Sequence, residues 1–386
     1  MKILHLADLH LGKSVVNLSM LESQQYVLNQ AIDLCKKEGI KHIIISGDVY
    51  DRSIPPEGAV SLLNDFLSKV VLDEKIHVYM ISGNHDSKER LSCFNGILEK
   101  QGLFIDSGVS DELLMSKHVI EEDGLKVNIY SLPYFYPSEI RVKTGDDAIK
   151  DYETAINKVL GKNTIDNKEI NILNAHFFVT SDGGDPIRSD SESKTSVGTI
   201  EQVSFRVFDM FDYVALGHLH CPQCIGKETV RYAGSPLKYS VDEIGQRKVF
   251  NIINIKSKDD INFKEIDITP LYKFVYMEGT VDELTQNSDE KDFSIVFFKL
   301  TDTSHVLNAA TRLKIKYPHY VGLQYVNIKD DVDENETSLA KEEGFNDLTI
   351  EEQFYKFFRF INDKDLDQTQ KEAIKTASDE LEKENQ

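Results

Sequence analysis

Seven residues of types that bind metal ions stand at five places in the chain, each just after an apolar run. They are Asp8, His10, Asp48, Asn84, His176, His218 and His220. Carboxylate, imidazole and amide donors without thiolate suit Mn²⁺, Fe²⁺ or Zn²⁺ better than Ca²⁺. Seven donors are too many for one catalytic ion that keeps an open position. They suit two ions roughly 3.5–4 Å apart that share one carboxylate.

Such a metal pair indicates phosphoester hydrolysis. It deprotonates a bridging water, places the resulting hydroxide opposite the leaving group and neutralises charge that grows on the non-bridging oxygens. A lone DLH or GNHD sequence is more often a turn with a capping aspartate. The joint occurrence of all the motifs, each after an expected strand, favours the metal centre over that structural interpretation.

The local spacing agrees with a shared site. Asp8 with His10, and His218 with His220, are i, i+2 pairs, which point to one face of an extended segment. A glycine directly precedes three of the ligand candidates and leaves room for sharp turns and close backbone approach. These glycines are Gly47, Gly83 and Gly217.

The elements that must position these residues alternate between strand and helix. We expect strands at 2–7, 42–46, 76–81, 126–132, 170–175, 212–216 and 248–255, and helices at 20–38, 57–72 and 146–160. Residues 180–199 form a polar loop. This order predicts a layered α/β fold, in which ligands gather outside the carboxyl ends of the strands.

The composition changes near Thr269 and Pro270. Residues 270–328 predict a small α+β capping domain, with strands at 272–279, 293–300 and 320–328 and helices at 280–286 and 304–316. The phosphoesterase domain is thus expected over 1–269. Residues 329–347 are acidic and poor in large apolar groups, which is typical of a linker.

Residues 348–386 are expected to form a helical module. Thr349 and Glu352 fit a capping box, and an apolar stripe follows at helical spacing. The stripe comprises Ile350, Phe354, Phe357, Phe358 and Ile361. Either this helix packs back on its own chain, or it binds the groove of a partner.

The net charge of −21 argues against tight DNA binding by this chain alone. Residues 331–386 carry 17 acidic and 7 basic residues, so −10 of the −21 lies in this tail and −11 in the rest. Bound divalent cations would also reverse the local sign at a metal site. If DNA is the substrate, a partner is expected to supply much of the affinity for DNA.

The remaining composition sets broad limits. No run reaches the roughly 20 apolar residues of a membrane span, and the start MKILHLADLH does not resemble a signal peptide, so a cytoplasmic location is expected. Four cysteines do not suggest a disulfide framework. Cys221 and Cys224 form a C-x-x-C that could be a metal or redox pair, although no second such motif accompanies it; incidental thiols are the favoured interpretation.

The ordered set D-x-H, GD-x-x-D, GNHD, H and GH-x-H resembles the calcineurin-like metallophosphoesterases, whose fold has two sheets flanked by helices. Further segments resemble the SbcD family, the nuclease subunits of bacterial SbcCD complexes. These segments are DLHLGK at 8–13, GDVYDRSIPP at 47–56, GNHDSKERL at 83–91, YVALGHLHCPQ at 213–223, AGSPLKYS at 233–240 and YPHYVGLQYV at 317–326.

The resemblance implies roles for individual residues. It assigns one ion to Asp8, His10, Asp48 and His220, and the other to Asp48, Asn84, His176 and His218, with Asp48 as the bridge. His85 matches a histidine that contacts the scissile phosphate and assists the leaving oxygen. Arg52 matches a phosphate-binding arginine of related phosphatases. Cys221 departs from the family, in which basic residues are common at that position.

The activity implied is manganese-dependent cleavage of DNA: ATP-dependent exonuclease on duplex ends and endonuclease on hairpins or single strands, in DNA repair, recombination and replication. The implied partner is SbcC, a coiled-coil ATPase, which the aromatic stripe at 350–361 would contact. A homodimer within a heterotetramer is also implied. The alternatives are a phosphoprotein phosphatase or cyclic-nucleotide phosphodiesterase of the same superfamily, and a scaffold whose metals only stiffen the fold.

Overall fold

The computed structural model describes residues 1–181, 186–192, 201–286 and 291–328, with separate positions between 349 and 374. The chain divides into two compact units, Met1–Lys299 with Asn308–Leu323, and Leu300–Leu307 with Gln324–Gln386. The domain boundaries expected from the sequence at 269, 328 and 347 stay predictions. No helix within the described ranges is long and apolar enough to cross a membrane.

The first six-stranded sheet has the order β16-β15-β1-β4-β5-β6. Its members are β1 (Lys2–Leu6), β4 (His42–Ser46), β5 (His77–Ile81), β6 (Leu103–Asp106), β15 (Val249–Ser257) and β16 (Asp260–Asp267). Strands β1, β4, β5 and β6 run parallel, and β15 pairs antiparallel with β1. The carboxyl ends of β1, β4 and β5 therefore meet at one edge.

The second six-stranded sheet has the order β13-β14-β12-β9-β8-β7. Its members are β7 (Ser116–Glu122), β8 (Leu125–Leu132), β9 (Ile170–His176), β12 (Tyr213–Gly217), β13 (Gln223–Ile225) and β14 (Lys227–Tyr232). Strands β8, β9, β12 and β14 are parallel, with β7 and β13 antiparallel at the edges. Here too the ligand-bearing strands β9 and β12 are central neighbours.

The two sheets pack face to face because their inward-pointing side chains form one apolar cluster. Ile3 and Ile44 of the first sheet and Ile172 of the second belong to it. Alternate residues of β1 and β4, such as Leu4 and Ile43, point the other way into a separate cluster. The central strands of each sheet are thus buried on both faces, which explains why they are mostly apolar.

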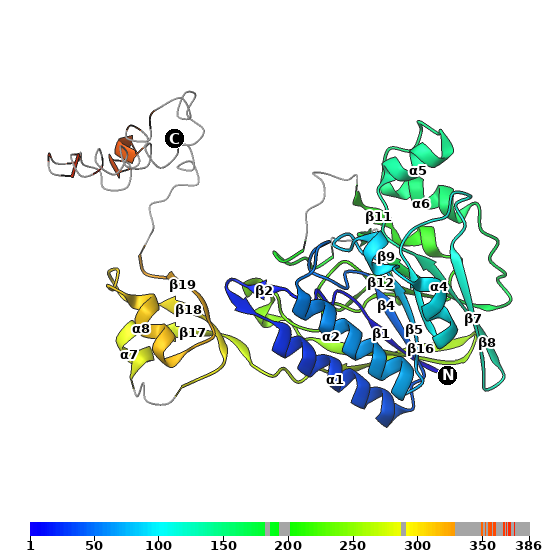
Figure 1. The fold of residues 1–386 in the computed structure, drawn as a ribbon, viewed down its shortest axis with the longest axis horizontal. Coiled ribbons are helices and arrows are strands. Elements are labelled where there is room, and N and C mark those ends of the chain that lie inside the picture. The colour runs from blue at the N-terminus through cyan, green and yellow to red at the C-terminus, as the bar shows by residue number, and fades with distance from the viewer. Residues whose placement is uncertain are drawn as a thin grey trace. The chain divides into compact units, whose positions relative to one another are not determined.

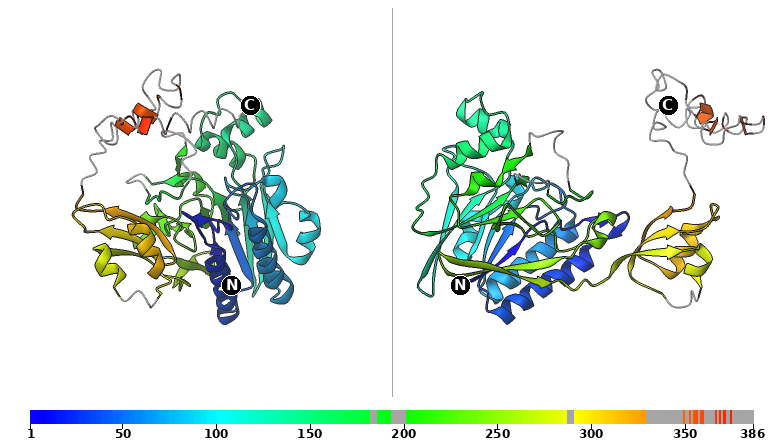
Figure 2. Two further views of the ribbon diagram at one scale, coloured as in Figure 1. Left: turned by 60° about the vertical axis from the view of Figure 1, so that its left-hand side comes forward. Right: turned by 180° about the vertical axis from the view of Figure 1, so that it is seen from behind.

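Helices cover the outer faces. Helices α1 (Leu21–Glu38) and α2 (Glu57–Ser68) pack on the first sheet, and α6 (Tyr152–Leu160) packs on the second beside α5 (Pro137–Thr144). In Figures 1 and 2 these two helix pairs lie on opposite sides of the sheets. The fold class expected from the sequence, two sheets flanked by helices, is confirmed.

The predicted helix at 146–160 is wrong over its first part. Asp151 caps the helix at Tyr152, and its side chain accepts a hydrogen bond from the Thr154 amide at 2.8 Å. Residue Gly145, at φ 66°, ends the preceding helix α5, which the sequence did not reveal. Strands β6, β7, β14 and β16 were also missed.

A three-stranded sheet of order β17-β18-β19 follows β16. It comprises β17 (Phe274–Gly279), β18 (Ile295–Leu300) and β19 (Tyr320–Tyr325), with helices α7 (Val281–Thr285) and α8 (Ala309–Lys316). All five elements lie where the sequence placed them, although α8 starts later and β19 ends earlier.

At the chain's end, the predicted capping box is confirmed. The Glu352 amide donates to Thr349 Oγ1 at 3.3 Å, and the Thr349 amide donates to Glu352 Oε2 at 2.9 Å. Of the apolar stripe, Phe354 and Phe358 are described and helical, whereas Ile350, Phe357 and Ile361 lie outside the described residues.

Candidate metal centre

The seven ligand candidates meet where five strands of the two sheets end. Asp8 and His10 follow β1, Asp48 follows β4, Asn84 follows β5, His176 ends β9, and His218 and His220 follow β12. Six of the seven are buried, and Asn84 is half-buried. The fold brings the whole predicted set together.

Asp48 lies between histidines from two sides. Its Oδ2 is 3.7 Å from Nε2 of His10 and 3.4 Å from Nε2 of His176. On the His10 side, Nε2 of His10 lies 3.0 Å from Nε2 of His220. The carboxylate of Asp48 therefore lies between a histidine that follows β1 of the first sheet and a histidine that ends β9 of the second.

On the His176 side, Asn84 joins two imidazoles. Its Oδ1 is 3.0 Å from Nε2 of His176 and 3.1 Å from Nδ1 of His218. Asp8 Oδ1 lies 3.9 Å from Nδ1 of His176 and accepts a hydrogen bond from the His218 amide at 2.8 Å. Asp8, which follows β1 of the first sheet, thus binds the backbone of the loop that follows β12 of the second sheet.

Ligand-capable atoms also gather in a way the sequence did not reveal. Two groups each have such atoms within 4.8 Å of one another: Asp8, Asp48 and His176, and His10, Asp51 and His85. Asp51 was not among the predicted ligands. The available signal was its place as the second aspartate of GD-x-x-D.

The donor set fits divalent cations. Asp8 Oδ2 and His10 Nδ1 are buried without a hydrogen-bond partner among the described residues. Buried polar atoms of this kind are costly unless something satisfies them. The oxygen and nitrogen donors around Asp48 are of the types that hold Mn²⁺, Fe²⁺ or Zn²⁺. An ion beside Asp48 would satisfy Asp8 Oδ2, whereas Nδ1 of His10 lies 3.7 Å from Oδ1 of Asp51.

The electrostatics of the site balance buried acids against buried imidazoles. Burial favours neutral Asp48, but its neighbours, His176 foremost, outweigh burial and hold the pKa of Asp48 well below its usual range. Burial lowers the pKa of His176, yet Asp48 overrides it and raises that pKa to about 9. A cation that takes Nε2 of His176 must displace a proton, so metal binding there strengthens as pH rises.

Several ligands hold backbone conformations that L-residues rarely adopt. The φ angles are 51° at Asp8, 43° at His10, 46° at Asp48 and 104° at His218. Hydrogen bonds between loops hold two of them: the Asp8 amide donates to the Gly47 carbonyl at 3.1 Å, and the His10 amide donates to the Asp48 carbonyl at 2.9 Å. Strained residues of this kind cluster at functional sites.

The predicted close approaches are confirmed, at Gly47 as well, where a Cβ would lie 2.4 Å from His176 Nδ1. A Cβ at Gly83 would lie 2.1 Å from Asp48 Oδ1, and one at Gly217 would lie 1.9 Å from the Ser46 carbonyl oxygen. Any side chain at either position would push the ligand loops apart.

Asp86 ties the loops after β4 and β5 together. Its carboxylate accepts hydrogen bonds from the amides of Val49 at 3.1 Å, Tyr50 at 2.9 Å and Gly83 at 2.9 Å. Burial, the largest influence, raises the pKa of Asp86 to about 6. The sequence analysis did not single this residue out, although it completes the GNHD motif.

His85 and Arg52 lie beside the ligands. His85 donates from Nδ1 to the Asp51 carbonyl at 2.8 Å, and its Nε2 lies 4.0 Å from Asp48 Oδ2, with the side chain 20% exposed. Arg52 is 67% exposed, and its Nη2 lies 3.9 Å from Asp51 Oδ2. His85 can therefore reach a substrate at the centre, whereas Arg52 lies at the rim.

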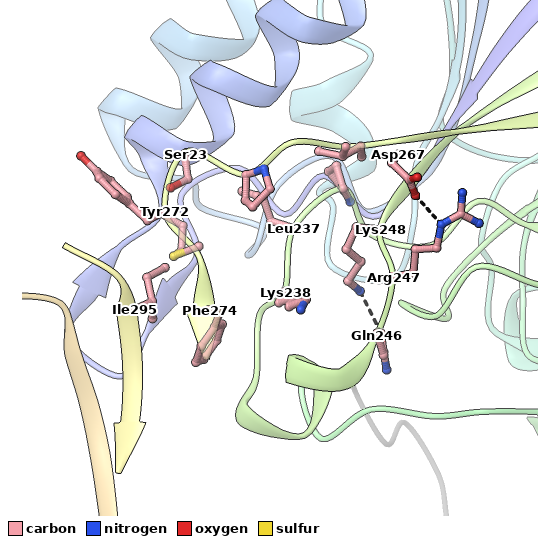
Figure 3. A pocket seen from close by; sticks show the side chains of 14 residues that line it. Ser23, Leu237, Lys238, Gln246, Arg247, Lys248, Asp267, Tyr272, Phe274 and Ile295 are labelled. Atoms are coloured by element: carbon pink, nitrogen blue, oxygen red, sulfur yellow. Dashed lines mark hydrogen bonds and ion pairs between the residues drawn. The ribbon is translucent and has the colours of Figure 1, made fainter. Parts of the chain in front are cut away.

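Two cavities differ in their relation to the centre. One of about 320 Å³ is lined by His218, Phe178 and Arg188, whose guanidinium lies 3.7 Å from the centre of the Phe178 ring. Another, of about 260 Å³, is lined by Leu237, Phe274 and others, and none of the seven ligand candidates contributes to it (Figure 3). The first cavity therefore reaches one of the seven ligand candidates, His218. Cys221 and Cys224 are free thiols.

Comparisons with known proteins agree with this geometry. A family model of calcineurin-like phosphoesterases matches residues 1–222. A protein of Staphylococcus epidermidis (strain ATCC 12228 / FDA PCI 1200), described as the SbcD subunit of the nuclease SbcCD, is 35% identical over 379 residues, covering 97% of each chain. Among solved structures, the E. coli phosphoesterase Yfce is 11% identical with a TM-score of 0.27, covering 70% of this chain and all of that one. A TM-score of 0.27 supports no conclusion about this chain.

Proposed function

The chain belongs to the calcineurin-like phosphoesterases and, within them, to the SbcD family, and we propose that it is a two-metal DNA nuclease that works with a SbcC-type ATPase. The observation that carries this proposal is the placement of Asp48 between Nε2 of His10 and Nε2 of His176, in one group with Asp8, whose buried Oδ2 has no hydrogen-bond partner among the described residues. The relative's description as part of a nuclease supplies the substrate class.

The ligands divide into two sets around Asp48. Asp8, His10 and His220 would hold one divalent ion, and Asn84, His176 and His218 the other, with manganese as the first choice. When bound, such ions supply positive charge that polarises a phosphate and lowers the pKa of water. Asp51, which shares a group of ligand-capable atoms with His10 and His85, is a further candidate for the first set.

The chain's own residues supply the rest of the mechanism. The Asp51 carbonyl accepts from Nδ1 of His85 and so leaves Nε2 turned toward the carboxylate of Asp48. From there His85 can contact the scissile phosphate and donate a proton to the leaving oxygen. The exposed guanidinium of Arg52 is placed to pair with a phosphate of the strand at the rim.

Because the chain is acidic, we expect a partner to provide much of the DNA binding. Residues near the end of the chain could form the surface that this partner contacts. Phe354 is 43% exposed on the helical turn that follows the Thr349 cap. We place the contact with the coiled coil of the ATPase at residues 350–361, and expect a homodimer of the nuclease chain within a cytoplasmic heterotetramer. Truncation after residue 340 should abolish binding to the ATPase and leave metal-dependent hydrolysis of a small phosphodiester intact.

The test is hydrolysis of linear duplex DNA with Mn²⁺, with and without the ATPase partner and ATP, using Asp48→Asn as the inactive control. Nucleotide release that the partner and ATP strengthen, together with cleavage of hairpins, supports the proposal. No release in either condition, with brisk hydrolysis of a phosphoprotein or cyclic nucleotide, overturns it in favour of another branch of the superfamily.

A further inference from the structure

The imidazole of His220 is backed by a buried carboxylate from a distant part of the chain. Glu243, with no exposed side-chain surface, places Oε1 3.2 Å from Nδ1 of His220. Ser191 Oγ lies 2.6 Å from the same nitrogen and donates to the same carboxylate oxygen. A carboxylate can only accept, and a hydroxyl that has given its one hydrogen to that carboxylate accepts as well. Both partners therefore require hydrogen on Nδ1.

This arrangement decides which nitrogen can bind a metal. With hydrogen on Nδ1, Nε2 of neutral His220 carries the lone pair, and it is Nε2 that faces Nε2 of His10. His176 also turns Nε2 to the centre, but its Nδ1 donates to a neutral acceptor, the Ser46 carbonyl, at 2.8 Å. A carboxylate behind an imidazole makes it a more basic ligand than a carbonyl does.

Lys248 fixes the carboxylate in turn. Its buried ammonium donates to Glu243 Oε2 at 2.6 Å, to the His220 carbonyl at 2.8 Å and to Ser235 Oγ at 2.9 Å. Gln246 Oε1 also lies 3.0 Å from this ammonium, a contact that Figure 3 draws. Lys248 thus holds one oxygen of Glu243 and the backbone of His220 together, and leaves the other oxygen turned to Nδ1.

We propose that Glu243 is a positioning residue that sets the tautomer and basicity of His220, with Lys248 fixing its orientation, and so strengthens one of the two metal positions selectively. The inference rests on the proposed metal centre. It adds to that centre an asymmetry: the ion held through His220 binds more tightly because of Glu243, whereas the ion held by His176 and His218 does not depend on it.

Glu243→Gln gives a sharp test because Lys248 dictates how the new amide turns. The ammonium has only hydrogens to offer, so the amide oxygen of the glutamine must face Lys248 and its NH₂ must face His220. Nδ1 then loses its carboxylate acceptor, and only the Ser191 hydroxyl, 2.6 Å away, is left to accept its hydrogen. The share of His220 with hydrogen on Nε2 therefore rises, and that share cannot bind a metal ion through Nε2.

The experiment compares wild type, Glu243→Gln and a control, Glu169→Gln, in full-length protein. Glu169 also hydrogen-bonds a lysine, Lys126, but it lies before β9, away from the ligand end of that strand. ¹⁵N NMR of the metal-free protein reports the His220 tautomer, and Mn²⁺ titration calorimetry reports both binding steps. We expect Glu243→Gln to increase the share of His220 with hydrogen on Nε2 and to weaken the binding of one Mn²⁺ about 10–100-fold. Binding of the other ion should stay unchanged, and so should both binding steps in the control.

Unchanged tautomer and unchanged affinities in Glu243→Gln overturn the inference, while a wild type that binds no pair of ions overturns the proposed centre instead. If the single variant does not fold, the double variant Glu243→Gln with Lys248→Met removes the ammonium that holds the amide oxygen and frees the amide to turn this oxygen to Nδ1. That variant should keep hydrogen on Nδ1 and lose affinity for one ion only in part. Wild-type affinity for both ions in it would overturn the inference.

Discussion

Nε2 of His10 and Nε2 of His220 lie 3.0 Å apart although 210 positions separate the two residues. Each histidine follows a strand of a different sheet, so the distance shows how closely the two sheets align their carboxyl ends. Two imidazole nitrogens at this separation share at most one hydrogen between them. A cation beside them would be stabilised by both, which makes this pair one half of the expected metal centre.

Replacing the central carboxylate should abolish hydrolysis without unfolding the protein. Asp48→Asn keeps the volume of Asp48 and the oxygen that the His85 amide donates to at 2.9 Å. It removes the charge that two metal positions share, so we expect phosphodiesterase activity to fall at least about 10³-fold, as for loss of a main electrostatic stabiliser. The thermal midpoint should fall, because the substitution breaks the buried charge pair of Asp48 with His176, but the protein should stay folded. A scaffold protein would lose stability with no hydrolytic activity to lose.

His85→Gln should separate chemistry from metal binding. Glutamine cannot supply a proton as an imidazolium does, so we expect kcat to fall about 10²–10⁴-fold, the range of general acid catalysis. Mn²⁺ titration should still show two ions, since His85 is not among the seven ligands. Unchanged kcat in His85→Gln would remove this residue from the mechanism.

Gly83→Ala tests the close approach of the ligand loops. The added Cβ would lie 2.1 Å from Asp48 Oδ1 and 2.3 Å from the Asp48 amide nitrogen. We expect unfolding free energy to fall by about 1–3 kcal/mol, as for other overpacked positions, together with weaker Mn²⁺ binding. Gly108→Ala is the matched control, because nothing lies within 4 Å of a Cβ at that position. Equal effects of the two substitutions in urea unfolding would contradict the account.

Acid should destabilise the protein through buried His42. Burial lowers the pKa of this histidine from 6.5 to about 4, although Glu122 opposes the shift. The unfolded chain therefore takes up a proton at pH values where the folded protein does not. The stability that neutral His42 contributes is present above pH 6.5 and is lost as pH falls toward 4.

The measurement is urea unfolding between these pH values. The slope from one such histidine is at most about 1.4 kcal/mol per pH unit. His42→Gln, which cannot take up a proton, should show a shallower pH dependence than the wild type over this interval. A variant with the same slope as the wild type would show that His42 does not titrate as described.

The ligands could be predicted from sequence because each follows a strand, and strand ends are the most regular feature of a parallel sheet. Asp86 and Glu243 could not be recognised in this way. Asp86 acts through three backbone amides, and Glu243 meets His220 across 23 positions with no spacing that marks the contact. Such partners are decided by tertiary packing of loops, which periodicity does not encode.

The missed elements have local reasons as well. Strand β16, DINFKEID, is nowhere buried, and it pairs only with β15 at the edge of its sheet, so it lacks the apolar run of a central strand. The break between α5 and α6 depends on Gly145 and the Asp151 cap, inside a stretch whose apolar spacing also fits one continuous helix.

The central claim is a pair of metal ions that this chain needs in order to cut DNA. The most direct measurement is Mn²⁺ titration of metal-stripped protein. Calorimetry counts the bound ions, and nucleotide release from linear duplex DNA is measured in the same samples. We expect the wild type to bind two ions per chain and to release nucleotides at the maximal rate only when the second ion is bound. Asp48→Asn should lose both the paired binding of Mn²⁺ and the release of nucleotides. Release that persists in the presence of a chelator, or a single ion at full activity, would contradict it.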